Sequence, residues 1–291
     1  MKIQKNILIS IFVLLFFWQS IGFAKETNRL IPEKSGLEEI LETKQLMISV
    51  SEDNEPYYIY DPKPGYPGFE VEIARAYADY LGVKLTKITP LTTFKHHAEA
   101  LEKGKVHISM GNSSNLERGK LVSFSLPYTF TSTGGLVNKL AIPPEPEGEV
   151  VSNNPYKSIL DLQFQPGIRM AVKSDTYNYT FIREQFGGKF QIYTYLKDSL
   201  ALQALLKNTV NCYIADNLYL EGLLQKYPSL KNDYKPLLSS VVEKQISIAV
   251  RKYDILLLTD LNFFIREMKR SGQIEKLKQK YFNNNKWVTG K

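Results

Sequence analysis

The chain has 291 residues, of which 43% are hydrophobic and 23% charged, and its formal net charge is +7. This length and apolar content support a real hydrophobic core in one large domain or in two lobes of ordinary size. The basic residues are spread along the chain, and no basic cluster is interleaved with aromatic residues, which argues against nucleic-acid binding.

The first 24 residues have the pattern of a cleaved secretory signal peptide. Lys2 and Lys5 precede an apolar run over residues 7–18, and small residues at Gly22 and Ala24 suit a signal peptidase. A membrane anchor is the alternative, but the run is shorter than the roughly 20 residues that a spanning helix needs. No cysteine follows the cleavage site to carry a lipid. We therefore expect an unanchored protein in a Gram-negative periplasm.

The residues after the signal peptide alternate between strand-like and helix-like patterns, which predicts an α/β class. The clearest helix has Phe69, Ile73, Tyr77 and Leu81 at a spacing of four, with Gly82 as a stop. In chain order, the expected strands cover 46–50, 106–110, 133–137, 168–172, 210–215 and 246–250, and the expected helices cover 69–81, 94–103, 177–186, 199–207, 254–269 and 273–282.

Two connecting features complete this outline. Residues 142–158 are expected to form a loop because prolines such as Pro143, Pro144 and Pro146 lack the amide donor that regular structure needs. Asp198 is expected to cap the helix over 199–207.

One short pattern occurs twice. Residues 100–106 and 204–210 share Ala-Leu-x-Lys-x-x-Val, and each pattern predicts a helix end, a turn and the start of a strand. A polar loop follows each strand, at 111–115 and at 216–217. Ligands of open parallel sheets bind beyond the carboxyl ends of strands, so two such loops could face each other across a cleft. Chance similarity between two amphipathic helix ends is the alternative.

Metal-binding and catalytic patterns are absent from the sequence. The histidines are His96, His97 and His107, and the first two are adjacent on an expected helix, where they point about 100° apart. No GxxxxGK[ST], GxGxxG or GxSxG motif occurs. The one cysteine, Cys212, lies in an apolar run and is expected to be a buried core residue. We expect no metal, no cofactor and no catalytic residue.

Two charged residues near the polar loops suit a small zwitterionic ligand. Arg118 follows the loop over 111–115, and a guanidinium group binds a carboxylate through two parallel hydrogen bonds. Asp216 stands at a strand end, where its carboxylate could face an ammonium group. The alternative role of Asp216 is to cap a helix that starts near Leu218.

Six segments match, in order, the motifs of one known family. They are Gly68–Ala74 (G-F-E-V-E-I-A), Ala100–Val106 (A-L-E-K-G-K-V), Asn115–Arg118, Phe124–Tyr128 (F-S-L-P-Y), Val250–Lys252 and Met268–Phe282. From Leu46 to Trp287 the sequence resembles the family 3 extracellular solute-binding proteins, the polar amino-acid receptors of ABC importers.

The resemblance implies an α/β two-lobe periplasmic-binding-protein fold of type II. Each lobe would be a mixed sheet flanked by helices, with a two-crossing hinge near 131–135 and 243–246. The implied boundaries are 1–24 for the signal peptide, 25–44 for an N-terminal extension, 45–131 with 246–287 for lobe one, 132–245 for lobe two, and 288–291 for a tail.

The resemblance also implies a ligand site and the roles of its residues. Arg118 would bind the ligand carboxylate, helped by Gly111 and Ser113 in the preceding loop and by the hydroxyl and backbone N–H of Thr176. Asp216 would hold the ammonium group. Phe94 and Tyr57 would pack against the ligand or form the pocket wall. Asp175 departs from the family's small residue, and its charge would repel a carboxylate unless it turns away or caps a helix.

The expected function is a monomeric binding protein that delivers a small amino-acid-like ligand to an ABC permease and catalyses nothing. An enzyme that resembles cyclohexadienyl dehydratases is an open alternative, and Asp175, Glu52 or Asp53 would supply its catalytic carboxyl group. A free-standing ligand sensor is a further alternative, whereas a fused sensor is disfavoured because the sequence stops at Lys291. The loop after the first strand has Ser51, Asp53 and Asn54 where receptors for cationic amino acids tend to carry an acid and an aromatic residue, so arginine, lysine and histidine are not the favoured ligands.

Overall fold

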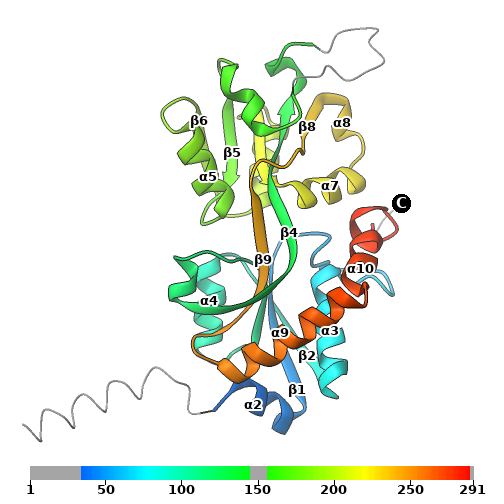
Figure 1. Cartoon of the computed structure of the whole chain (residues 1–291). Helices are drawn as coiled ribbons and strands as arrows, with labels where there is room; N and C mark the ends of the chain where they lie inside the picture. Colours follow the sequence, from blue (N-terminus) through cyan, green and yellow to red (C-terminus); the bar gives the residue numbers. More distant parts are fainter. Residues whose placement is uncertain (1–33, 145–155, 289–291) are drawn as a thin grey trace, which may run out of the picture.

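Two antiparallel strands, β4 (Val122–Asn138) and β9 (Glu243–Arg251), connect an upper and a lower lobe (Figure 1). The structure is a computed structural model that describes residues 34–144 and 156–288. The predicted signal peptide, most of the predicted 142–158 loop and nearly all of the predicted tail lie outside these residues. Strand β4 pairs with β9 up to Ser132 and with lobe-two strands from Thr133 onward, so it belongs to both lobes.

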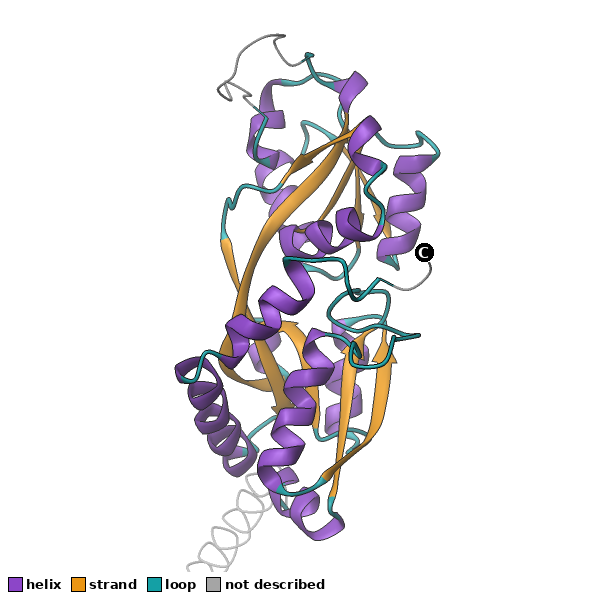
Figure 2. Cartoon of the chain, turned by 90° about the vertical axis from the view of Figure 1, so that its right-hand side faces the viewer, coloured by secondary structure: helices purple, strands orange, loops and turns teal. Residues whose placement is uncertain are grey.

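Lobe one is built on the strand order β2-β1-β3-β9-β4. Strands β1, β2 and β3 are parallel, and β9 runs antiparallel to β3. Helices flank the sheets of both lobes (Figure 2). The elements of lobe one are β1 (Gln45–Ser51), β2 (Lys84–Leu91), β3 (Ile108–Ser113), α2 (Gly36–Thr43), α3 (Phe69–Leu81), α4 (Phe94–Glu102), α9 (Ile255–Arg270) and α10 (Gln273–Phe282).

Lobe two repeats this plan with the order β4-β7-β5-β6, and β8 pairs with the other edge of β4. Strands β5, β6 and β7 are parallel, whereas β4 is antiparallel to β7 and β8. The elements of lobe two are β5 (Arg169–Lys173), β6 (Gln191–Tyr195), β7 (Cys212–Asp216), β8 (Tyr234–Leu237), α5 (Tyr177–Phe186), α6 (Asp198–Leu206), α7 (Asn217–Lys226) and α8 (Leu230–Asp233), with short 3-10 turns at Lys139–Ala141 and Ile159–Phe164. A further 3-10 turn, Arg118–Lys120, belongs to lobe one.

The helices form where apolar residues recur with the helical period. In α3, Phe69, Ile73 and Tyr77 are fully buried on one face, and Gly82 ends the helix in the left-handed conformation at φ 64°. The predicted helices over 69–81, 177–186 and 273–282 are confirmed to the residue. None of the helices in the described residues is long and apolar enough to cross a membrane.

The described part of the predicted N-terminal extension is folded onto lobe one. Ser35 caps α2 in a capping box with Glu38. The buried carboxylate of Asp254 accepts hydrogen bonds from the Ser35 hydroxyl and from the Gly36 amide, each at 2.7 Å. The start of α2 is therefore tied to the N-terminus of α9.

Candidate ligand-binding cleft

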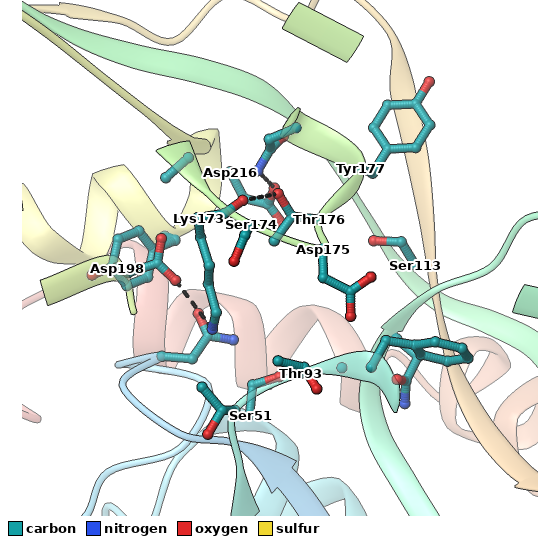
Figure 3. Close-up of a pocket in the computed structure, with 18 of the residues that line it drawn as sticks. Ser51, Thr93, Ser113, Lys173, Ser174, Asp175, Thr176, Tyr177, Asp198 and Asp216 are labelled. Carbon is teal, nitrogen blue, oxygen red and sulfur yellow. Dashed lines mark hydrogen bonds and ion pairs between the residues drawn. The ribbon is translucent and has the colours of Figure 1, made fainter. Parts of the chain in front are cut away.

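A cavity of about 110 Å³ lies between the lobes, at the carboxyl ends of β3, β5 and β7. This is the edge where open parallel sheets bind ligands. Figure 3 shows Asp175 and Thr176 of lobe two opposite Ser51 and Thr93 of lobe one. Seven of the eight residues assigned from the sequence line the cavity: Phe94, Gly111, Ser113, Arg118, Asp175, Thr176 and Asp216.

Arg118 presents a guanidinium group that has no carboxylate partner within the described residues. Its ring-stacking partner is Phe94, whose centroid lies 4.5 Å from the guanidinium carbon. Its Nη1 donates to the Ser113 carbonyl at 3.4 Å, and its Nη2 donates across the cleft to the Asp175 carbonyl at 2.9 Å. Burial lowers the pKa of Arg118, and the charges of Asp175 and Asp216 partly oppose this shift. The guanidinium therefore remains positively charged, and it keeps further N–H donors that can bind an anion.

The loop before Arg118 holds it in place through backbone contacts. The Asn115 side chain accepts a hydrogen bond from the Arg118 amide at 2.8 Å. Gly111 adopts φ 72°, and a Cβ there would lie 2.8 Å from the carboxylate of Glu70 behind the loop. Its amide donates to Tyr128 Oη at 3.0 Å, while the Tyr128 hydroxyl donates to Glu70. Glycine is thus required where the cavity wall passes over this buried carboxyl group.

The segment that opens α5 supplies Asp175 and Thr176. Asp175 adopts a left-handed backbone at φ 56°, and its carboxylate makes no ion pair or hydrogen bond within the described residues. Thr176 caps α5: its hydroxyl accepts from the Tyr179 amide at 3.2 Å and donates to the Lys173 carbonyl at 2.7 Å. The predicted use of this hydroxyl for a ligand therefore competes with capping, whereas the first amides of α5 have no partner inside the helix.

Asp216 lines the cavity, but it is already paired with a cation. Its Oδ1 accepts hydrogen bonds from Lys244 Nζ and, at 2.7 Å, from Asn178. Asp216 occupies the N-cap position of α7 without a side-chain capping bond, because the Asn217 side chain accepts from the Leu218 amide instead. The helix-cap alternative for the Asp216 side chain is therefore wrong.

Lys244 was not found by sequence reasoning. It lies at the start of β9 with a side chain only 2% exposed, and its Nζ also donates to Asn178 Oδ1 at 2.7 Å. Burial lowers the pKa of Lys244, and the neighbouring charge of Asp216 opposes that shift. The sequence held a usable signal, because Lys244, Ile246 and Ile248 alternate on one buried face of the strand.

A second buried pair, Lys173 with Asp198, was also missed. Lys173 Nζ lies 3.5 Å from Asp198, and the Tyr213 hydroxyl donates to the same carboxylate at 2.8 Å. The predicted capping role of Asp198 is wrong: the N-cap residue of α6 is Lys197, and Asp198 is the first helical residue. Its side chain turns into the protein, where it neutralises Lys173.

Tyr57 does not line the cavity. It is 3% exposed and packs in the core of lobe one against Phe69 and Phe282, with ring centroids 6.0 and 5.1 Å away. The predicted contact with the ligand or the pocket wall is therefore replaced by a core role. Phe94 does form part of the wall, beneath Arg118.

Further contacts join the lobes beside the cavity. Asp53 accepts a hydrogen bond from the Ser199 amide at 2.7 Å, and Glu52 lies 3.4 Å from Lys197. Glu55 pairs with Lys226. These acids of lobe one are thus engaged with lobe two and lie outside the cavity lining.

Within residues 34–144 and 156–288, no group of histidine, cysteine and acidic side chains could hold a metal ion. Cys212 is fully buried in β7. His97 lines the cavity with Nδ1 2.9 Å from the hydroxyls of Ser49 and Ser109, and burial lowers its pKa to about 4. It is a neutral wall residue at pH 7.

Residues 46–284 match the model of the bacterial extracellular solute-binding proteins, family 3. The chain belongs to this family. It is 26% identical over 248 residues to the L-cystine-binding protein TcyJ of Escherichia coli K12, covering 84% of this chain and 85% of that protein. The α/β fold and the cleft between the lobes are therefore those of a periplasmic binding protein.

Two further relatives connect the family 3 protein with an enzyme. A solved structure of an ancestral amino acid-binding protein, a precursor of cyclohexadienyl dehydratase, superposes with a TM-score of 0.69 at 28% identity and covers 85% of this chain and all of that one. The cyclohexadienyl dehydratase of Pseudomonas aeruginosa is 33% identical over 97 residues, covering 33% of this chain and 35% of the enzyme.

Proposed function

We propose that the protein captures a small amino acid between its lobes and delivers it to an ABC importer without chemical change. The observation that carries this proposal is the guanidinium of Arg118, which lines the cavity, stacks on Phe94 and has no carboxylate partner among the described residues. A ligand carboxylate is the complement that such a planar fork binds best.

Contacts from both lobes favour capture by closure. Arg118 belongs to lobe one, whereas the N-terminus of α5, whose first amides have no partner inside the helix, belongs to lobe two. A carboxylate bound by both would stabilise the arrangement in which the lobes touch, because it binds that arrangement more tightly than one with the lobes apart.

The family supports export and a transport partner. Its members are extracellular solute-binding proteins, and we propose a periplasmic location with a cleaved signal peptide at residues 1–24. The partner would be an inner-membrane ABC permease, and the protein would act as a monomer.

An enzyme related to cyclohexadienyl dehydratase is the second candidate, favoured by the 97-residue similarity to that enzyme. It would need a cavity carboxyl group free to exchange a proton with the substrate. Two of the three cavity acids are engaged with lysines, which leaves Asp175 for that task.

A thermal-shift screen of the purified protein distinguishes these functions. The panel contains the twenty amino acids, ornithine, citrulline and prephenate, each at 1 mM. We expect a rise of several degrees with at least one amino acid, since ligand at 100 times Kd adds about 2.7 kcal/mol of stability. A shift with prephenate alone, followed by its conversion, would favour the enzyme, and silence across the panel would contradict amino-acid capture.

A further inference from the structure

The charges that line the cavity are balanced in number. His97 is neutral at pH 7 because burial lowers its pKa to about 4. The remaining charged lining residues are three cations and three acids: Arg118, Lys173, Lys244, Asp175, Asp198 and Asp216.

Two of these acids are already matched inside the protein. Lys173 pairs with Asp198, and both side chains are at least 86% buried. Lys244 pairs with Asp216, and the lysine is the more buried partner at 2% exposure. Buried ion pairs of this kind hold together because separating them leaves a charge without compensation. The charges left for a ligand are therefore one cation, Arg118, and one acid, Asp175.

Arg118 and Asp175 lie next to each other across the cleft. The Arg118 guanidinium donates to the Asp175 backbone carbonyl at 2.9 Å, yet the two side chains form no ion pair within 4.0 Å. The carboxylate and ammonium of an α-amino acid are attached to the same carbon. A single α-amino acid head group could therefore satisfy both residues at once.

From this balance we propose that the site takes a small α-amino acid with an uncharged side chain, and that Lys244 is the residue that excludes cationic ones. In this arrangement the ligand carboxylate binds Arg118 and its ammonium binds Asp175. The inference rests on the proposed function and specifies its substrate class. It assigns the ammonium to Asp175 in place of Asp216.

Lys244 excludes a cationic side chain in two ways. Its Nζ neutralises Asp216, the acid that would otherwise attract a second positive charge, and it places its own ammonium at the cavity wall against Asn178 and Tyr177. A ligand cation would meet a fixed like charge in a site with little water to screen it. An acidic side chain is disfavoured as well, because Lys173 is already matched by Asp198.

The size of the cavity agrees with this class. Pockets for drug-sized ligands have volumes of about 300–1,000 Å³, and the 110 Å³ of this cavity lies well below that range. Such a space suits a compact amino acid better than an extended one.

Isothermal titration calorimetry tests the substrate class on the wild-type protein at pH 7. The neutral probes are L-alanine, L-serine and L-threonine, and the charged probes are L-lysine, L-arginine, L-aspartate and L-glutamate. We expect at least one neutral probe to bind tenfold or more tightly than every charged probe. Tighter binding of a charged probe would overturn the inference while leaving amino-acid capture standing. Absence of binding by all seven probes would also overturn the inference, and the thermal-shift screen with all twenty amino acids would then decide separately whether amino-acid capture stands.

Variants of Lys244 test the mechanism of exclusion. Lys244→Met frees the Asp216 carboxylate and should raise the affinity for L-lysine at least tenfold, whereas Lys244→Arg keeps the charge and should not. The double variant Lys244→Met with Asp216→Asn removes both charges and should lose that gain. Lys207→Gln, at an exposed position after α6, is the matched control. If a folded Lys244→Met variant binds L-lysine no better than wild type, the role of Lys244 is wrong.

Discussion

The turns that precede β3 in lobe one and β7 in lobe two have the same geometry but lead to different electrostatic outcomes. Lys103 and Lys207 end α4 and α6 with φ of −81° and −86°, and Gly104 and Asn208 follow with φ of 63° and 56°. The repeated Ala-Leu-x-Lys-x-x-Val pattern thus encodes one turn used twice.

Beyond these turns the two lobes diverge. The loop after β3 leads to a cation without a carboxylate partner, Arg118, whereas β7 ends in an acid, Asp216, that is neutralised by Lys244 from β9. Local sequence therefore determines where the polar groups lie. The charge that each lobe offers to a ligand depends on residues far away in the chain.

Asp216→Asn should produce the largest loss of stability. It leaves Lys244 buried without its carboxylate, and breaking a buried pair in this way costs about 3–5 kcal/mol. Urea unfolding of the ligand-free protein measures the change. The double variant Lys244→Met with Asp216→Asn is the control and should recover most of the stability. A loss below about 0.5 kcal/mol in the single variant would show that the pair is not coupled, since surface substitutions already cover that range.

Arg118→Ala should act on binding. Removing the cation that faces the ligand carboxylate should weaken the affinity by about 2–4 kcal/mol, measured by calorimetry with the amino acid that gives the largest thermal shift. The stability of the ligand-free protein should fall much less than in Asp216→Asn, because Arg118 has no carboxylate partner to leave behind. Unchanged affinity would remove Arg118 from the site.

Glu70 should make the stability of lobe one depend on pH. Burial raises the pKa of Glu70 from 4.5 to about 7. The Glu70 carboxyl group is therefore protonated in the folded protein at a pH where it is ionised in the unfolded chain. The contribution of Glu70 to the free energy of unfolding is complete below pH 4.5. The contribution falls as the pH rises to about 7, by roughly 3 kcal/mol in all.

The Glu70 contribution can be isolated by difference. The free energies of unfolding of wild type and Glu70→Gln are compared from pH 4.5 to 7.5. The stability of wild type relative to the variant should fall as the pH rises. A difference that stays constant with pH would mean that folding does not raise the pKa of Glu70.

Gly104→Ala should give the smallest effect and tests the shared turn. No atom lies within 4 Å of the Cβ that would be added, so the cost is the left-handed backbone alone, about 1 kcal/mol. Asn208→Gly at the matching position should change stability by only a few tenths of a kcal/mol. Equal losses from both variants would contradict the similarity of the turns.

Much of the fold could be predicted from local patterns. The helix over 69–81 has an apolar residue at every fourth position, and the strands at 168–172 and 246–250 are apolar apart from Arg169 and Ser247. The edge strands β2 and β6 have no fully buried residue and were not predicted. Their half-exposed, polar sequences lack the hydrophobic signal, because only one neighbour covers each of them.

The candidate site could also be predicted only in part. Arg118 and Asp216 could be assigned because each follows a recognisable strand end. The pairing of Asp216 with Lys244 could not, since it joins residues 28 positions apart through the packing of two strands. Tyr57 shows the converse, because a residue near a ligand loop in sequence can point into the core.

A crystal structure of the protein with the amino acid that gives the largest thermal shift would show directly where the ligand binds. We expect the ligand between the lobes, with its carboxylate hydrogen-bonded to the Arg118 guanidinium and its ammonium on Asp175. A ligand bound with its carboxylate away from Arg118, or outside this cavity, would show that the proposed site is wrong.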